Sequence, residues 1–253
     1  MKITFLGTGT SQGVPVIGCT CEVCRSLDYR DKRLRSSVHL QLDNQSLVID
    51  TGPDFRQQML REDVKSLDAV IITHSHKDHT AGLDDVRAYN FLQGIDMPVY
   101  AQDYVLKQLT TEYAYAFEPH RYPGIPRLNL IPIESENFLI AKTSVTPLPV
   151  KHLNMPVLGF RIGDFSYITD ANAIPESTLE KLKGTRVMVL NALQQEKHIS
   201  HFNLSEAVAM AQQIGAERTY FTHISHKMGL HKAVGAGLPA GIQLAHDGLV
   251  INM

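Results

Sequence analysis

Four potential metal ligands stand within six positions of the sequence, directly after an apolar run. The segment IITHSHKDHTAGLDD, residues 71–85, contains His74, His76, Asp78 and His79. Clustered imidazoles beside a carboxylate are poor core material, because each needs a hydrogen-bond partner once it leaves water. Nitrogen and oxygen donors of this kind suit Zn²⁺, Mn²⁺ or Fe. A strand end lets His74 and His76 converge on one ion, and the turn beyond it directs Asp78 and His79 toward a second.

A second group of metal-binding side chains lies in the segment GCTCEVC, residues 18–24, which holds all three cysteines of the chain. An odd number of cysteines in one tight loop argues against a disulfide framework. The spacing lets Cys19, Cys21 and Cys24 surround one Zn²⁺ and leaves one tetrahedral position for another residue. His226, in the segment THISH, is the expected fourth ligand. His39 is a competitor, but it alternates within SVHLQLD and fits a strand position more simply.

The elements that must position these side chains are short strands and a few helices. Early apolar runs follow one another through short turns, whereas later ones are separated by helices. This mixture favours two sheets packed face to face with helices outside over one doubly wound parallel sheet. The expected strands cover residues 2–6, 37–43, 45–50, 68–73, 97–101, 129–133, 144–150, 159–169, 186–192 and 218–224. The expected helices cover residues 55–63, 83–92, 105–117, 175–183 and 203–215.

Length and composition bound the class of protein. The 253 residues fit one large domain, 1–253, and no internal repeat or composition break divides them. A formal net charge of −2 gives no sign of a surface for nucleic-acid polymers. No apolar run approaches the roughly 20 residues that span a bilayer, and the first residues fit a strand better than a secretion signal. We therefore expect a cytoplasmic protein without a membrane anchor.

Two further segments have less certain roles. The basic run RDKRLR, residues 30–35, is expected to be a solvated loop rather than a phosphate-binding patch. The segment HRYPGIPR, residues 120–127, is rich in Pro and Gly and is expected to be a loop. The wider stretch from Tyr104 to Arg127 is a candidate flap over a site, and an ordinary connection is equally compatible with its composition.

The motif HxHxDH after an apolar strand resembles the metallo-β-lactamase superfamily. That resemblance implies an α/β fold, the αββα four-layer sandwich of two mixed sheets, with a dinuclear metal site at one edge. Three later strand-end residues match the remaining ligands of the family: His152 in LPVKH, Asp170 in SYITDA and His223 in YFTH. The resemblance implies a first metal held by His74, His76 and His152, a second held by Asp78, His79 and His223, and Asp170 between them.

The combination of GTGTSQGVPVIGCTC, HxHxDH and THISH resembles more narrowly the PhnP-type cyclic phosphodiesterases. This likeness implies two catalytic Zn²⁺ or Mn²⁺ ions, one structural Zn²⁺ on the cysteine loop, and possible homodimers. It implies hydrolysis of a small cyclic phosphodiester, such as phosphoribosyl 1,2-cyclic phosphate, by a hydroxide that bridges the metals. His201, before a helix that Asn203 is expected to cap, matches a phosphate-contacting histidine, with His198 as its competitor. Asp78 and His201 are the expected catalytic residues.

Several other functions remain compatible with parts of the pattern. A tRNA 3′-processing endonuclease shares HxHxDH, but it needs a basic arm that is absent from this sequence. A PqqB-like accessory protein without hydrolytic activity shares the cysteine loop, although the dinuclear motif is complete here. A thioester or lactone hydrolase of the glyoxalase II kind lacks GCTCEVC. A purely structural zinc protein would leave the His and Asp residues without a role.

Overall fold

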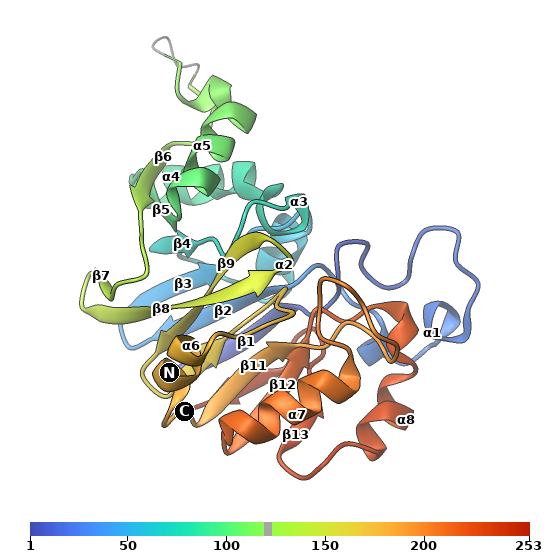
Figure 1. Ribbon diagram of the computed structural model, residues 1–253. Coiled ribbons are helices and arrows are strands. Elements are labelled where there is room, and N and C mark those ends of the chain that lie inside the picture. The colour runs from blue at the N-terminus through green and yellow to red at the C-terminus, as the bar shows by residue number, and fades with distance from the viewer. Residues whose placement is uncertain (119–122) are drawn as a thin grey trace. The chain divides into compact units, whose positions relative to one another are not determined.

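The computed structural model describes residues 1–118 and 123–253, and contacts within the chain divide it into two compact units. The first unit comprises Met1–Gly7, Ser37–Glu134 and Gly248–Met253. The second unit comprises Thr8–Ser36 and Ser135–Asp247. Each unit is built on one seven-stranded sheet (Figure 1). The expectation of a single domain stays a prediction.

The sheet of the first unit joins both ends of the chain to its middle. Its strand order is β14-β1-β2-β3-β4-β5-β6, antiparallel from β14 to β3 and parallel from β3 to β6. A parallel pair needs a crossover, and the helices of this unit supply it. The strands are β1 (Lys2–Gly7), β2 (Ser37–Leu42), β3 (Gln45–Ile49), β4 (Ala69–Ile71), β5 (Met97–Ala101), β6 (Leu128–Pro132) and β14 (Val250–Asn252).

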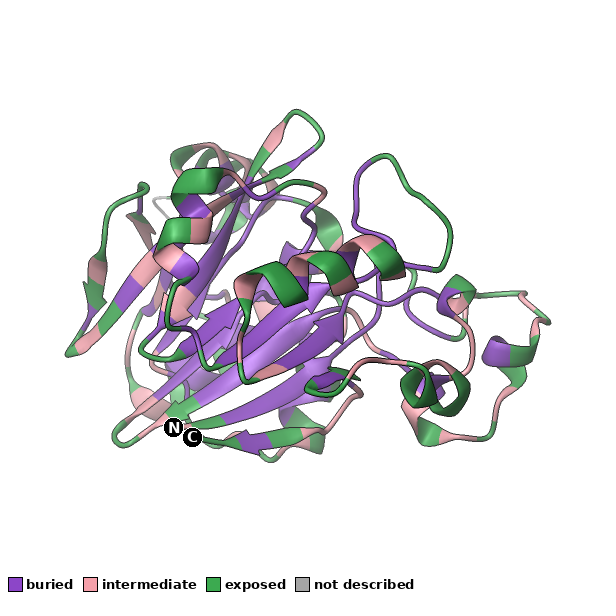
Figure 2. Cartoon of the chain, turned by 60° about the horizontal axis from the view of Figure 1, so that its bottom comes forward, coloured by how far each residue is buried: buried purple, intermediate pink, exposed green. Residues whose placement is uncertain are grey.

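The helices of the first unit cover one face of this sheet with apolar side chains. The core they share with the strands includes Val48, Phe55, Val70, Tyr89 and Leu109, all buried. Figure 2 shows the inner strands mostly in the colour of buried residues, whereas the edge strands β6 and β14 also contain exposed positions. The helices are α2 (Phe55–Arg61), α3 (Lys77–Thr80), α4 (Arg87–Gln93) and α5 (Asp103–Glu112), with 3₁₀ turns η2 (Leu83–Val86) and η3 (Ala114–Ala116).

The sheet of the second unit has the order β13-β12-β11-β10-β9-β8-β7. It is antiparallel from β7 to β10 and parallel from β10 to β13. The carboxyl ends of β10, β11 and β12 therefore point the same way, which gathers the residues that follow them. The strands are β7 (Phe138–Ile140), β8 (Thr143–His152), β9 (Met155–Ile162), β10 (Phe165–Tyr167), β11 (Val187–Asn191), β12 (Arg218–Thr222) and β13 (Ile242–Leu244).

The helix α7 (Leu204–Ile214) has the clearest local signals in the second unit. The Asn203 side chain accepts a hydrogen bond from the Glu206 backbone N–H, and the Glu206 carboxylate accepts one from the Asn203 backbone N–H, which forms a capping box. Gly215 ends the helix in the left-handed conformation (φ 70°). The expected cap at Asn203 is confirmed. The other helices are α1 (Glu22–Arg25), α6 (Glu176–Leu182) and α8 (His231–Ala236), with 3₁₀ turns η1 (Tyr29–Asp31) and η4 (His226–Met228).

The sequence predicts most strands and helices but misses three short strands, and the single strand expected over residues 159–169 is the end of β9 followed by β10. The strands β7, β13 and β14 have three residues each, and no alternation is visible over so short a span. The single helix expected over residues 83–92 is a 3₁₀ turn followed by α4. The candidate flap includes residues 119–122, which lie outside the described residues. Within the part of the chain that the structure describes, no helix combines the length and apolar character needed to cross a bilayer.

Candidate metal centres

The first unit gathers four predicted ligands where β4 ends and α3 begins. His74 Nε2 lies 3.1 Å from His76 Nδ1, and the ring centroids of His74 and His79 are 4.2 Å apart. His79 Nε2 lies 3.2 Å from Asp78 Oδ2. His74 and His79 are buried, because the strand end and the short helix turn inward at this point. The pairing of donors expected from the spacing of HxHxDH is therefore present in this unit.

The buried carboxylate of Asp50, which the sequence analysis did not select, orients these histidines. Asp50 accepts hydrogen bonds from His79 Nδ1 at 2.7 Å and from the backbone and hydroxyl of Thr73. Because the Thr73 hydroxyl donates to Asp50, its oxygen accepts from His74 Nδ1 at 2.9 Å. Burial raises the pKa of Asp50, while His79 and Thr73 act in the opposite direction. Both histidines thus direct Nε2 away from the carboxylate.

Close packing of the turn after the motif depends on a glycine. A Cβ at Gly82 would lie 2.1 Å from the carbonyl oxygen of Gly52. The Gly82 N–H also donates to the Thr51 carbonyl at 2.8 Å, and the Thr51 N–H donates to the His79 carbonyl. Any side chain at position 82 would therefore push the ligand turn away from the strand end of β3.

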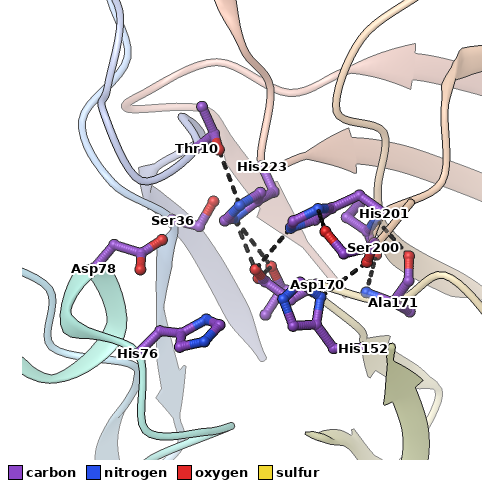
Figure 3. A network of polar contacts seen from close by, with 12 residues as sticks. Thr10, Ser36, His76, Asp78, His152, Asp170, Ala171, Ser200, His201 and His223 are labelled. Carbon is purple, nitrogen blue, oxygen red and sulfur yellow. Dashed lines mark hydrogen bonds and ion pairs between the residues drawn. The ribbon is translucent and has the colours of Figure 1, made fainter. Parts of the chain in front are cut away.

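The second unit gathers three predicted ligands at the ends of its strands. Asp170 follows β10 and His223 follows β12, and both have left-handed backbone angles, with φ 56°. Asp170 Oδ2 lies 3.2 Å from His223 Nδ1 and accepts from the Thr169 hydroxyl at 2.5 Å. The Asn191 side chain bonds the backbone of Ala171 at 2.7 and 2.9 Å and holds this turn. Figure 3 shows the carboxylate of Asp170 directed at the histidines.

His152, at the end of β8, is oriented by the chain in the same manner as His79. Its Nδ1–H donates to the Ser200 carbonyl oxygen at 2.8 Å, which leaves Nε2 as the ligand nitrogen. The donor atoms of His152, Asp170 and His201 lie within 4.8 Å of one another. The predicted ligands of this unit therefore lie together, and His201 lies among them.

His201 occupies a buried position beside Asp170. Its Nε2 lies 3.1 Å from Asp170 Oδ1, and its ring stacks on that of His223 at a centroid distance of 5.0 Å (Figure 3). Its Nδ1 lies 2.9 Å from the Ser200 hydroxyl, which also contacts His198 at 3.1 Å. Burial, followed by the nearby His201 and Lys227, lowers the pKa of His198. His198 contacts His201 both through Ser200 and directly, with the two Nδ1 atoms 3.4 Å apart, and it is His201 that lies beside Asp170.

The three cysteines converge on His226, also within the second unit. The sulfur atoms of Cys19, Cys21 and Cys24 lie 3.3, 3.4 and 3.6 Å from His226 Nδ1. Hydrogen bonds from the Cys24 backbone and from His226 lower the pKa of Cys21 to about 6, whereas burial raises that of Cys24 to about 11. His39 does not compete, because its Nε2 bonds the Ser46 hydroxyl at 2.8 Å within β2 and β3.

The basic run at residues 30–35 is not the solvated loop that was expected. Arg33 is buried, and it donates to the Thr8 hydroxyl at 2.8 Å and to the Ala245 carbonyl at 2.7 Å. Arg30 pairs with Asp28 at 2.6 Å. The prediction failed because the sequence gives no sign that Arg33 has a partner such as Ala245, which lies 212 positions away.

Both groups of donors fit divalent cations. Two ligands of one tetrahedral ion lie about 3.3 Å apart, since Zn–N and Zn–O bonds are about 2.0–2.2 Å long. The donor separations of 3.1 Å between His74 and His76, and of 3.2 Å between His223 and Asp170, match this value. Where Nδ1 of His79 donates to Asp50, Nε2 carries a lone pair that faces the Asp78 carboxylate. A cation between these two acceptors would remove their repulsion.

Comparisons with known proteins identify the family of the chain. The family model described as a beta-lactamase superfamily domain matches residues 45–224. An octanoyltransferase from Porphyromonas gingivalis is 39% identical over 252 residues, which are 98% of this chain and 51% of that protein. A ribonuclease Z from a Synechococcus strain is 31% identical over 175 residues, 64% of this chain and 48% of that protein. The chain spans about half the length of the curated relatives it matches.

Solved structures place the chain in the same family. A crystal structure described as a new diphosphatase from the PhnP family superposes with a TM-score of 0.93 at 41% identity, and it covers 99% of this chain and 96% of that one. Zinc-bound PqqB from Methylobacterium extorquens is 20% identical with a TM-score of 0.78 over the full length of both chains, a likeness of fold alone. The predicted fold class is confirmed. The chain belongs to the metallo-β-lactamase superfamily.

Proposed function

We propose that this chain is a metal-dependent hydrolase that cleaves a small cyclic phosphodiester, such as a phosphoribosyl cyclic phosphate. The proposal rests on how the chain holds its candidate ligands. In His74, His79 and His152, Nδ1 is engaged by a partner inside the protein, and Nε2 is directed at other donors. Outer hydrogen bonds of this kind fix the tautomer and ring orientation of histidines that bind metals.

The proposed catalytic ligands of the first unit are His74, His76, Asp78 and His79. Those of the second unit are His152, Asp170 and His223. Divalent ions bound by these residues would neutralise phosphate oxygens and acidify water at neutral pH. Zn²⁺ and Mn²⁺ both accept this donor set.

His201 is the proposed acid–base residue. Its Nε2 lies 3.1 Å from Asp170 Oδ1, so a proton on that nitrogen is held beside the carboxylate. The Ser200 hydroxyl at Nδ1 and the stacked ring of His223 restrict the imidazole to this orientation. A protonated Nε2 would donate to the oxygen that leaves phosphorus, where negative charge develops.

We also propose that Cys19, Cys21, Cys24 and His226 hold a structural Zn²⁺. Three sulfur atoms and one ring nitrogen complete a tetrahedral donor set with no position for a substrate. Their sulfur–nitrogen separations of 3.3–3.6 Å are those of ligands that share one ion. The low pKa of Cys21 favours the thiolate that zinc requires.

A second candidate substrate is a small diphosphate. The PhnP-family structure at 41% identity is described as a diphosphatase. Hydrolysis of a diphosphate and of a cyclic phosphodiester both require attack of water on a phosphorus atom and departure of a bridging oxygen, so the same ligands could serve both reactions. A net charge of −2 disfavours a polynucleotide substrate, even though a ribonuclease Z is among the relatives.

The relative named octanoyltransferase suggests a third substrate, a medium-chain acyl thioester. That protein is about twice as long as the region matched by this chain. An octanoyl thioester therefore belongs in the same assay panel as cyclic phosphodiesters, diphosphates and linear phosphodiesters. Hydrolysis of the thioester alone would contradict the phosphorus chemistry proposed here.

The ligand assignment is tested with His76→Ala and Asp170→Ala. We expect each variant to lose roughly a thousandfold in kcat/KM toward the preferred substrate, because bound ions contribute several kcal/mol of charge stabilisation. Metal analysis should give about three ions per wild-type chain and fewer in each variant. Turnover equal to that of the wild type in both variants would refute a metal-dependent mechanism.

A further inference from the structure

Thr10, in the segment GTGTSQG, lies beside one of the proposed ligands without being a ligand itself. Its side chain is buried, and its hydroxyl lies 3.1 Å from His223 Nε2 (Figure 3). Both residues belong to the second unit. They are separated by 213 positions in the sequence, so no local pattern connects them.

The backbone around Thr10 is bonded to the residue that follows His223. The Thr10 N–H donates to the Ile224 carbonyl at 3.1 Å, and the Ile224 N–H donates to the Thr8 carbonyl at 2.8 Å. Gly9 forms a bridge with Ile224 on one side and with Arg35 on the other. These bonds fix the Thr10 Cα relative to His223, so the hydroxyl has a defined direction.

A glycine at position 9 makes this close passage of the chain possible. A Cβ there would lie 2.9 Å from the Arg33 carbonyl oxygen and 3.0 Å from that of Leu34. The Gly9 N–H donates to Leu34 at 2.7 Å, and its carbonyl accepts from the Ser36 hydroxyl at 2.9 Å. Position 10 is therefore held by neighbours on two sides and cannot follow a movement of His223.

The ring of His223 is contacted at both nitrogens. Asp170 Oδ2 lies 3.2 Å from Nδ1, and Thr10 Oγ1 lies 3.1 Å from Nε2. The backbone of His223 is left-handed, with φ 56°, a conformation that persists only where surrounding contacts enforce it. Two opposed partners fix the plane of the imidazole whichever nitrogen carries the proton.

We propose that Thr10 is a positioning residue for His223, which it holds in the orientation that binds the catalytic cation. This inference rests on the proposed function, in which His223 is a ligand. Without the hydroxyl, the imidazole of His223 can rotate about its side-chain bonds. Part of the free energy of cation binding is then spent on fixing the ring in the binding orientation. Partners of ligand histidines typically contribute 10- to 100-fold in metal affinity, or about that factor in activity.

The test compares Thr10→Val with Thr10→Ser. Valine keeps the shape of threonine and removes the hydroxyl, whereas serine keeps the hydroxyl and removes the methyl group. Ser11→Ala is the matched control, because Ser11 is an exposed neighbour in the same loop. The affinity of the metal-free protein for Mn²⁺ and Zn²⁺ is measured by competition with a chelator, with thermal unfolding of the metal-free proteins beside it.

We expect Thr10→Val to have a 10- to 100-fold lower affinity for the more weakly bound of the catalytic ions. Thr10→Ser should restore most of this affinity, and Ser11→Ala should equal the wild type. Wild-type affinity in Thr10→Val, or equal loss in the serine and valine variants, would overturn the role of the hydroxyl. If the wild type itself binds no ion through His223, the proposed function fails instead, which the same titration of His223→Ala would reveal.

Discussion

At the scale of single residues, the centres depend on partners that do not bind metal. Asp50 orients His79 directly and His74 through the Thr73 hydroxyl. It is fully buried, and its backbone is left-handed, with φ 66°. Loss of its negative charge would remove an acceptor from two ligands at once, because both depend on the same carboxylate.

We expect Asp50→Asn to lower the affinity of the first unit's ligands for Mn²⁺ or Zn²⁺ by about 10- to 100-fold. The NH₂ group of asparagine, which replaces one carboxylate oxygen, would stand against another donor, either the Nδ1–H of His79 or the N–H and O–H of Thr73. Metal content after dialysis against a weak chelator measures the effect. Asp43→Asn, which removes an exposed carboxylate from the turn between β2 and β3, is the control. Equal metal retention in the two variants would contradict the role given to Asp50.

At the scale of elements, the cysteine loop and the turn η4 meet at the four donors that we propose to hold a structural Zn²⁺. The Cys21 sulfur accepts from the Cys24 backbone at the start of α1, and Lys32 donates to the Cys24 carbonyl at 3.1 Å. Only Val14, Val23 and Cys24 are buried in the small apolar cluster here, among the described residues. So small a core cannot order the loop by burial alone.

We expect Cys21→Ser to remove one zinc ion per chain and to lower the melting temperature. It should leave kcat/KM near the wild-type value, because Thr8–Thr10 is bonded to Ile224 independently of the cysteines. Elemental analysis and calorimetry are the measurements. Thr20→Ala, an exposed position between two of the cysteines, is the control. A variant that retained all its zinc would exclude Cys21 as a ligand.

The sequence predicts those site residues that combine a metal-binding side chain with a position directly after an apolar run. His74, Asp170 and His223 each follow an apolar run, and the structure puts each at the end of a strand. Asp50 also follows such a run, QSLVI, but a lone aspartate after a strand is common in turns. Thr10, Ser200 and Arg33 could not be found, because their roles depend on contacts with residues that only the folded chain brings near.

At the scale of the whole molecule, each unit contains a buried histidine that burial keeps neutral. Burial lowers the pKa of His39 to about 4. Burial, followed by the charge of Arg33, lowers that of His231 to about 4 as well. His39 bonds Ser46 at 2.8 Å, and His231 Nδ1 lies 3.1 Å from the Arg33 guanidinium, so neither environment accepts a second proton readily.

Stability of the metal-free protein should therefore fall as the pH is lowered from about 6.5 to about 4. In that interval the unfolded chain binds protons on both histidines and the folded chain does not, so protons favour unfolding. Above pH 6.5 both histidines are neutral in the folded and in the unfolded chain, so protons no longer favour unfolding through these two residues. The full effect for His39 is about 3 kcal/mol, since each pKa unit corresponds to about 1.4 kcal/mol.

Urea unfolding of the wild type, His39→Gln and His231→Gln at several pH values measures the effect. We expect each variant to show a shallower dependence of the unfolding free energy on pH than the wild type below pH 6.5, whatever its absolute stability. All other ionisable groups are shared by the three proteins, so their contributions cancel from the comparison. Parallel curves for the wild type and a variant would mean that the substituted histidine is protonated in the folded state.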